Sequence, residues 1–309
     1  MTIAINLRTG YFEKMNILIT GGTGFVGSVL CQRLHDQGHN LTVLTRKPEK
    51  HKKRLPSRTV LVSVFSEINS PVDVVINLAG EGIAEKRWTP ERKKILEQSR
   101  IDLTADLVAF IRNNEHKPQV LISGSAVGYY GDSGSNLLTE FSEPHDEFSH
   151  RLCAAWESQA LRAKTDGVRV CILRTGLVIG KNGGFLKKML PSFRMGMGAK
   201  LADGKQWMSW IHMHDYLNMI QFLIDDKSLS GIFNATAPNP VTNHIFTKML
   251  ASVLHRPSFL TMPPSLLNMM FGDMAHLLIT GQRVIPKKFV DAGFEFKFPA
   301  LKPALEDVC

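Results

Sequence analysis

The stretch from residue 15 to residue 27 constrains the fold more than any other part of this chain of 309 residues. Residues 16–20 form a short apolar run that ends in a cluster of glycines, which is typical of a buried strand followed by a tight turn. From Phe25 onward, apolar residues recur three and four positions apart, which predicts an amphipathic helix. A strand, a glycine turn and a helix in this order predict the first unit of an α/β fold.

The glycine turn also predicts a ligand. Residues 22–27 satisfy G-x-G-x-x-G, and residues 20–27 fit T-G-x-x-G-x-x-G. Gly21 permits the tight turn, Gly24 lets the backbone approach a phosphate, and Gly27 lets the helix lie close to the strand. The amides of such a turn point at a dinucleotide pyrophosphate, although a glycine-rich turn without a ligand is the alternative. We expect the contacts with the cofactor to come from Thr20, Gly21, Thr23, Gly24, Phe25, Val26 and Gly27.

Short apolar runs and helical segments alternate through the first 175 residues. We expect strands over residues 16–20, 41–44, 60–65, 72–78, 120–123 and 168–173. We expect helices from residue 25, from residue 89 or 90 to 113, and from 151 to 165. This alternation predicts a doubly wound parallel sheet, whose ligands bind beyond the carboxyl ends of the strands.

Beyond residue 180 the alternation gives way to loops, a late strand over 231–237 and several helices. We interpret this half as a smaller, mostly helical lobe that closes over the cofactor. The expected domains are an N-terminal extension over 1–14, a nucleotide-binding domain over 15–235 and a C-terminal lobe over 236–309. Residues 181–210 of the second domain are expected to contribute to the cleft.

Composition limits the possible partners. The formal net charge of +9 favours anionic ligands, but no nucleic-acid motif accompanies it. No apolar run approaches the roughly 18 residues of a membrane span. The four cysteines lie far apart, which is typical of reduced thiols in a cytoplasmic protein. We therefore expect a cytoplasmic protein with a small-molecule substrate, without nucleic acid or membrane, and with a homodimer as an open alternative.

The residues after the second strand predict which nicotinamide cofactor binds. An acidic residue about 20 positions past the glycines normally holds the ribose 2′-hydroxyl of NAD. Thr45, Arg46 and Lys47 stand at that place here. A guanidinium can hold a 2′-phosphate with two hydrogen bonds, whereas a carboxylate would repel it. We predict that NADP(H) is preferred over NAD(H), with Thr45 and Arg46 at the phosphate. The alternative is that Arg46 only begins a solvated basic loop.

Several blocks of sequence carry a resemblance to a known family. The glycine turn, residues 77–80 and residues 123–126 resemble the extended short-chain dehydrogenase/reductase superfamily, which includes sugar-nucleotide epimerases and has a Rossmann fold. More specific blocks are similar to those of atypical YfcH-type epimerase-family proteins. They are residues 77–83, 87–88, 99–100, 156–157, 173–180, 206–212, 284–288 and 292–296. The resemblance covers nearly the whole chain from Met15 and includes the family's C-terminal domain of undefined function, over roughly residues 243–309.

The resemblance implies further contacts with the cofactor. Leu78 and Ala79 would border the adenosine half, and Gly80 would lie beside the phosphates. Arg100 would face the cofactor, and Val178 would lie near the nicotinamide ribose. Judged by residue type alone, Arg100 would be a surface salt-bridge residue and Val178 a core residue.

The catalytic residues of the superfamily are only partly present. Its members use a serine, a tyrosine that passes a proton, and a lysine four residues after the tyrosine. Ser125 occupies the position of the serine. The tyrosine and lysine positions fall near Ser149 and Cys153, and neither can replace its counterpart, because serine is a far weaker acid and cysteine carries no fixed positive charge.

Other residues near the predicted cleft are weaker candidates. As a hypothesis, Tyr129 or Tyr130 donates the proton, whereas the alternative that we favour is an aromatic loop packed against the smaller lobe. Glu81 could act as a base, cap a helix or bind Arg87. We expect no metal, because His212 and His214 should point apart at a strand end. We also expect Asp215 to cap the next helix.

These observations lead to two functional hypotheses. The first is an NADP(H)-dependent oxidoreductase or epimerase of atypical short-chain dehydrogenase type. Its substrate would be a small polar molecule, such as a nucleotide sugar or a carbonyl compound, held at Ser125. The second is a catalytically silent NADPH sensor or regulator, since related bacterial sequences carry a cell-division-inhibitor label. The missing tyrosine and lysine favour the second hypothesis, and the intact Ser125 loop favours the first.

Overall fold

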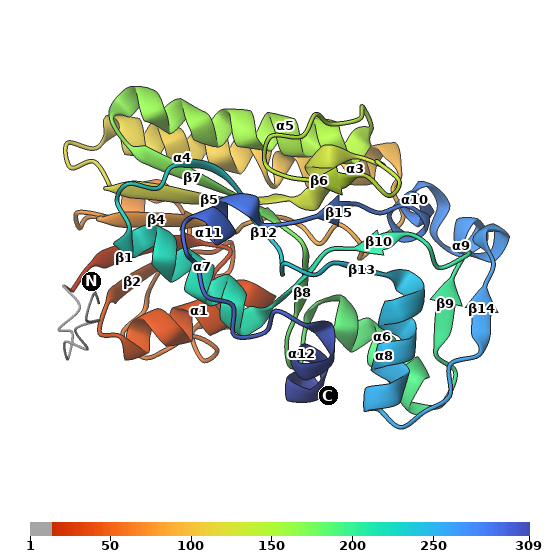
Figure 1. Ribbon diagram of the computed structural model, residues 1–309. Coiled ribbons are helices and arrows are strands. Elements are labelled where there is room, and N and C mark those ends of the chain that lie inside the picture. The colour runs from red at the N-terminus through yellow and green to blue at the C-terminus, as the bar shows by residue number, and fades with distance from the viewer. Residues whose placement is uncertain (1–13) are drawn as a thin grey trace, which may run out of the picture.

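A parallel sheet of seven strands forms the centre of the molecule (Figure 1). The computed structural model describes residues 14–309, so the expected extension over residues 1–14 lies almost wholly outside it. The strand order is β3-β2-β1-β4-β5-β7-β12. The strands are β1 Asn16–Thr20, β2 Asn40–Leu44, β3 Val60–Val62, β4 Val74–Asn77, β5 Val120–Ala126, β7 Arg169–Thr175 and β12 Gly231–Ala235. The predicted doubly wound sheet is confirmed.

Helices cover both faces of the sheet. On one face lie α1 (Phe25–Asp36) and α7 (Met213–Asp225), and on the other lie α4 (Ile101–Asn113) and α5 (Phe148–Leu161) (Figure 1). Alternate residues of β1 enter the two cores: Ile17 and Ile19 pack with α1 and α7, and Leu18 packs with α4 and α5. Because both faces are covered, the central strands are continuous apolar runs.

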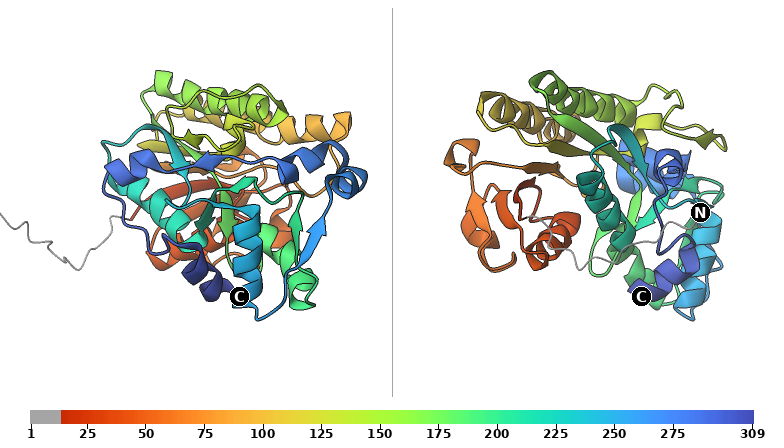
Figure 2. Two further views of the ribbon diagram at one scale, coloured as in Figure 1. Left: turned by 45° about the vertical axis from the view of Figure 1, so that its right-hand side comes forward. Right: turned by 60° about the vertical axis from the view of Figure 1, so that its left-hand side comes forward.

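The second half of the chain adds a smaller lobe beside the carboxyl ends of the strands (Figure 1). Its helices are α6 Gly184–Arg194, α8 Asn243–Val253, α9 Pro264–Phe271, α10 His276–Ile279 and α12 Leu301–Val308. Figure 2 shows that α8 and α12 lie side by side, and their apolar residues share one core with Trp210. Four short two-stranded pairs lie outside the large sheet in residues 14–309. They are β8 Leu177–Ile179 with β11 Trp210–His212, β10 Trp207–Met208 with β13 Val241–Thr242, β9 Ala199–Leu201 with β14 Leu260–Met262, and β6 Leu137–Leu138 with β15 Arg283–Val284.

The segment after β15 returns to the large sheet. Helix α11 (Lys287–Asp291) places Phe289 in the same core as Phe233 of β12, with ring centroids 5.1 Å apart. The backbone N–H of Val284 donates to Ser209 Oγ at 2.9 Å, and Asn234 Nδ2 donates to the Ile285 carbonyl at 3.0 Å. The C-terminal segment is therefore part of the sheet's core as well as of the lobe.

One expected helix is broken. The helix that we predict over residues 89–113 consists of α3 (Pro90–Gln98) and α4, with Ser99 and Arg100 at the break. The Thr89 hydroxyl caps α3 by accepting a hydrogen bond from the Arg92 backbone. The break lets the Ser99 hydroxyl accept a hydrogen bond from the Glu81 backbone at 3.1 Å, and lets Arg100 reach the same loop. The expectation of one continuous helix is wrong because these tertiary contacts outweigh the helical pattern.

The start of α7 also differs from expectation. The cap is His212, whose Nδ1 accepts a hydrogen bond from the His214 backbone at 3.1 Å. Asp215 is instead fully buried and accepts hydrogen bonds from the backbone of Lys297 and Phe298 at 3.0 and 2.9 Å. The aspartate therefore holds the C-terminal segment. No helix within residues 14–309 combines the length and the hydropathy that a membrane crossing requires.

Candidate nucleotide-binding site

The glycine turn between β1 and α1 has the backbone that the sequence predicts. Gly21 has φ +73°, and an added Cβ would lie 2.5 Å from the carbonyl carbon of Leu78. Gly27 would place a Cβ against the Gly21 carbonyl oxygen, so only glycine lets α1 pack on the turn. Gly24 is exposed, and the nearest atom to its added Cβ is the Gly21 carbonyl oxygen at 3.3 Å. Gly21 and Gly27 therefore shape the turn, whereas Gly24 faces outward.

The amides at the start of α1 are available to an anion. Gly24 is the N-cap residue, no side chain caps the helix, and its first turn contains no acidic residue. The turn lies where β1 and β4 are neighbours, which is the point at which the strand order reverses. Thr20 and Asn77, at the ends of these two strands, are joined by a hydrogen bond of 2.6 Å. We call this switch point, at the ends of β1 and β4, the crevice. It is the usual place for a dinucleotide in such a sheet, so the residues present fit a dinucleotide.

The Phe25 ring forms one wall of the turn. It packs against the backbone of Gly183 and Gly184, and a Cβ on Gly183 would overlap the ring. The absence of side chains on Gly183 and Gly184 therefore leaves room for the Phe25 ring. Val26 is half-buried and packs against the core of the sheet. Thr23 is half-buried in the turn itself.

The end of β2 presents the predicted cation. Thr45 is buried, and its backbone N–H donates to the Val62 carbonyl at 2.9 Å. The next side chain, Arg46, is 87% exposed, and its Nη2 donates to Glu81 Oε1 at 2.8 Å. That hydrogen bond lowers the pKa of Glu81, with burial acting in the opposite direction. The guanidinium of Arg46 is thus exposed at the edge of the crevice and paired there with Glu81.

A loop after β4 forms the opposite edge. Leu78 and Ala79 are half-buried, and Gly80 is exposed directly above the Arg100 guanidinium, where a Cβ would lie 2.9 Å from Arg100 Cζ. Arg100 donates to the Glu81 carbonyl at 2.8 Å and lies 5.4 Å from the centre of the Trp156 ring. Burial lowers its pKa. Arg100 therefore supports the loop from below, while Val178, half-buried against the main core, lies after β7.

Ser125 belongs to a buried polar network on the other side of the crevice. Its hydroxyl donates to Glu157 Oε1 at 2.6 Å, and Glu157 is paired with Arg174 through two contacts of 2.9 Å. Glu157 and Arg174 are buried, with side chains 5% and 2% exposed. Burial lowers the pKa of Arg174, but the hydrogen bonds and charge of Glu157 outweigh it and raise that pKa. Since a carboxylate can only accept, the Ser125 proton points at Glu157.

Tyr129 and Tyr130 both contact Arg174. The Tyr129 ring centre lies 3.3 Å from Arg174 Cζ, and His150 packs edge-on against the same ring. The Tyr130 side chain is fully buried, and its hydroxyl accepts from Arg174 at 3.1 Å and donates to Asn234 at 2.7 Å. Burial raises the pKa of Tyr130 to about 12. In this geometry the Tyr130 proton is directed at Asn234 and away from the crevice.

The tyrosine and lysine positions lie on the buried face of α5. Ser149 and Cys153 are both buried there, about two turns and one turn before Glu157, respectively. Burial raises the pKa of the Cys153 thiol to about 11. Ser149 contacts Glu147, whose other carboxylate oxygen lies 2.9 Å from His276 Nε2 of the lobe. This face of α5 therefore carries no cationic side chain between Ser149 and Glu157.

Sequence reasoning missed several members of these networks. It did not assign Glu157 or Arg174, although an arginine inside the apolar strand β7 signals a buried partner. It offered Arg87 as a partner of Glu81, but Glu81 binds Arg46 and Arg92, and Arg87 donates to the Met269 carbonyl. Over residues 14–309, no group of three or more His, Cys, Asp or Glu gathers around a metal position. His212 stacks on Phe298, whereas His214 contacts Asn218.

A separate groove of about 660 Å³ lies between α6 and α12. Its walls carry Lys181, Lys187, Arg194 and Asp307, together with apolar residues of both helices. It contains none of the predicted cofactor or catalytic residues. This groove is therefore separate from the residues that the sequence assigns to the cofactor.

The sheet order, the glycine turn at its switch point and the serine at the end of β5 together define a dinucleotide-binding Rossmann protein of the short-chain dehydrogenase/reductase type. The model of the NAD dependent epimerase/dehydratase family matches residues 17–236, and a domain of unknown function, DUF1731, matches residues 262–308. The chain belongs to the NAD dependent epimerase/dehydratase family.

Three similar proteins span nearly the whole chain. The Arabidopsis thaliana epimerase family protein SDR39U1 homolog, chloroplastic, is 40% identical and covers 96% of this chain and 87% of its own length. The Bacillus subtilis epimerase family protein YfhF is 36% identical, over 95% and 98%. The crystal structure of human epimerase family protein SDR39U1 with NADPH has a TM-score of 0.87 and 31% identity, over 95% of this chain and 99% of that one.

Proposed function

We propose that this protein binds NADP(H) at the turn between β1 and α1 and uses it to oxidise, reduce or epimerise a small polar substrate. The observation that carries the proposal is the uncapped start of α1, with the exposed guanidinium of Arg46 across the same crevice. The amides suit a pyrophosphate, and the guanidinium suits a 2′-phosphate. The NADPH in the crystal structure of the human relative supports the same cofactor.

The predicted contacts divide the cofactor site into four parts. The turn from Thr20 to Gly27 would hold the pyrophosphate, and Thr45 and Arg46 would hold the 2′-phosphate. Leu78 and Ala79 would border the adenosine half, Gly80 would lie beside the phosphates with Arg100 beneath it, and Val178 would lie near the nicotinamide ribose. When bound, the nicotinamide supplies or receives the hydride.

Ser125 would face the substrate as a hydrogen-bond acceptor. Its proton is directed at Glu157, so its lone pairs are what it can offer a ligand. A substrate hydroxyl suits such a serine. Tyr130 would support Arg174 through its hydroxyl, and Ser149 on α5 stands where other members of the superfamily have their proton-passing tyrosine.

A specific observation favours a second candidate function. The buried face of α5 carries Ser149 and Cys153 where the superfamily has its proton-passing tyrosine and its lysine. A protein that binds NADPH tightly but has no acid at this position could act as a sensor or regulator. Absorbance at 340 nm separates the candidates: turnover with any of a panel of sugar nucleotides, ketones and quinones supports the enzyme, and its absence across the panel supports the sensor.

The cofactor assignment is tested by calorimetry. Arg46→Asp should weaken NADPH binding by about tenfold or more, and NADH binding much less, because a bidentate contact to a phosphate is lost and a repulsive charge is gained. Arg54→Asp makes the same charge change in the same exposed loop and serves as the matched control. Equal losses for both cofactors, or no loss of NADPH affinity, would overturn the assignment of Arg46.

A further inference from the structure

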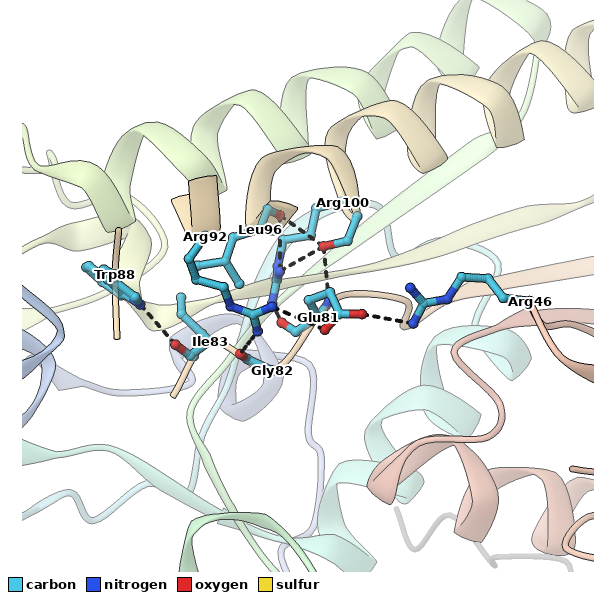
Figure 3. A network of polar contacts seen from close by, with 9 residues as sticks. Arg46, Glu81, Gly82, Ile83, Trp88, Arg92, Leu96 and Arg100 are labelled. Carbon is cyan, nitrogen blue, oxygen red and sulfur yellow. Dashed lines mark hydrogen bonds and ion pairs between the residues drawn. The ribbon is translucent and has the colours of Figure 1, made fainter. Parts of the chain in front are cut away.

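Glu81 lies between an exposed arginine and a buried arginine (Figure 3). Its Oε1 accepts from Arg46 at 2.8 Å, and its Oε2 lies 3.4 Å from Arg92 Nη1. The Arg46 side chain is 87% exposed, whereas that of Arg92 is 8% exposed. From sequence, Arg46 is expected to bind the cofactor or to begin a solvated basic loop, so its ion pair with a carboxylate of the same crevice is an unexpected feature.

The backbone of Glu81 is held on both sides. Its N–H donates to Ser99 Oγ at 3.1 Å, and its carbonyl accepts from Arg100 at 2.8 Å. Arg92 is anchored as well, because it also donates to the Gly82 carbonyl at 2.7 Å. Figure 3 shows these contacts converging on Glu81 from α3 and α4, while Arg46 approaches alone from the end of β2. The carboxylate is therefore fixed, and the Arg46 guanidinium is the part of the network that can move.

The charges of this network keep the free-energy cost low when Arg46 exchanges Glu81 for another anion. If Arg46 turns from Glu81 to another anion, the Glu81 carboxylate keeps Arg92 and is never left in the crevice without a counter-charge. The contact that Arg46 gives up is an exposed ion pair, which contributes little and is weakened by salt. An arriving phosphate offers Arg46 three acceptor oxygens in place of one carboxylate.

We propose that Glu81 sets the balance between NADPH and NADH by competing with the 2′-phosphate for the Arg46 guanidinium. This inference rests on the proposed function. In the free protein Glu81 holds Arg46, and NADPH has to break that contact, whereas NADH, which lacks the 2′-phosphate, leaves it in place. The carboxylate thus narrows the difference in affinity between the two coenzymes, and it does so through Arg46.

A double-mutant cycle tests the competition directly. Glu81→Gln keeps the shape of the side chain and an acceptor oxygen for Arg92, so the loop should stay folded. Calorimetry at low salt should show NADPH bound roughly two to five times more tightly by Glu81→Gln, or about 0.4–1 kcal/mol, with NADH affinity unchanged within about 1.5-fold. In the Arg46→Gln background, the added Glu81→Gln change should produce no gain.

Glu97→Gln removes an exposed carboxylate from α3 and controls for the change in net charge. Weaker NADPH binding in Glu81→Gln would show that Glu81 positions Arg46 for the phosphate, and a gain that persists without Arg46 would show a general charge effect. Either result overturns the inference about Glu81. As long as the wild-type protein binds NADPH, the proposed function still stands. A wild-type protein that binds neither coenzyme overturns both.

Discussion

At the scale of single residues, the ion pair between Glu157 and Arg174 is the most consequential contact of the crevice. It lies between α5 and β7, with Ser125 bound to Glu157 and with Tyr129 and Tyr130 in contact with Arg174. Removing two charges from water is expensive, so such a pair stabilises the fold only while both members are present. Its main effect is to fix which way the Ser125 hydroxyl points.

This argument predicts unequal costs for single and paired substitutions. Glu157→Leu alone should destabilise the protein by about 3–5 kcal/mol, because Arg174 is left buried and charged. Glu157→Leu combined with Arg174→Met should cost far less, since no charge remains uncompensated. Urea denaturation of both variants measures the difference.

A surface pair provides the control for that measurement. Arg151 and Asp146 lie 2.8 Å apart with side chains 60% and 75% exposed. Arg151→Met should therefore cost less than about 1 kcal/mol. If the double variant in the core is as unstable as Glu157→Leu alone, the loss comes from packing and the electrostatic argument is wrong.

At the scale of elements, two glycines of the turn between β1 and α1 have different roles, one in folding and one in binding. Gly21 has positive φ and touches the Leu78 backbone, whereas Gly24 has φ −81° and an outward-facing Cα. The first glycine is required by the chain itself, and the second is available to a ligand. The two can therefore be distinguished by substitution.

We expect Gly21→Ala to lose about 1–3 kcal/mol of folding free energy from backbone strain alone. Gly24→Ala should lose less than about 1 kcal/mol, yet weaken NADPH binding by roughly tenfold, because its methyl group lies in the path of the phosphate. Thermal denaturation and calorimetry on the same preparations report the two effects. Unchanged NADPH affinity in Gly24→Ala would contradict the assignment of the pyrophosphate to this turn.

The elements also show what the sequence can predict. Apolar runs and glycine turns identify the strands and their order along the chain, because the burial pattern of a strand is visible in a few consecutive residues. The break between α3 and α4 is invisible in the helical pattern, since Ser99 and Arg100 leave the helix to hold a loop that lies some twenty residues earlier in the chain. The family resemblance of residues 123–126 identifies Ser125 from sequence, whereas Glu157 and Arg174 are missed because their roles depend on contacts between α5 and β7.

At the scale of the whole molecule, Asp215 joins the start of α7 to the C-terminal segment. Its carboxylate is fully buried and accepts the backbone N–H groups of Lys297 and Phe298. Hydrogen bonds to a charged acceptor contribute about 1.5–3 kcal/mol each. The segment between α11 and α12 is therefore fastened to the large domain at this point.

Asp215→Asn should destabilise the protein by about 1.5–3 kcal/mol, because an amide accepts hydrogen bonds more weakly and brings donors that need partners. Hydrogen exchange should speed up most at the amides of residues 297 and 298. Asp291→Asn, at an exposed carboxylate, is the comparison variant. Uniformly faster exchange across the sheet, without a local maximum at these amides, would contradict this role for Asp215.

The return of the chain after β15 has a consequence for how this family is divided into modules. Phe289 and Phe294 complete the core beneath β12, and Asn234 of that strand binds the Ile285 carbonyl. Two family descriptions, one for residues 17–236 and one for residues 262–308, thus cover a single interleaved architecture. The C-terminal module cannot be exchanged independently, because a chain that ends after β12 would expose the apolar core that Phe289 and Phe294 cover.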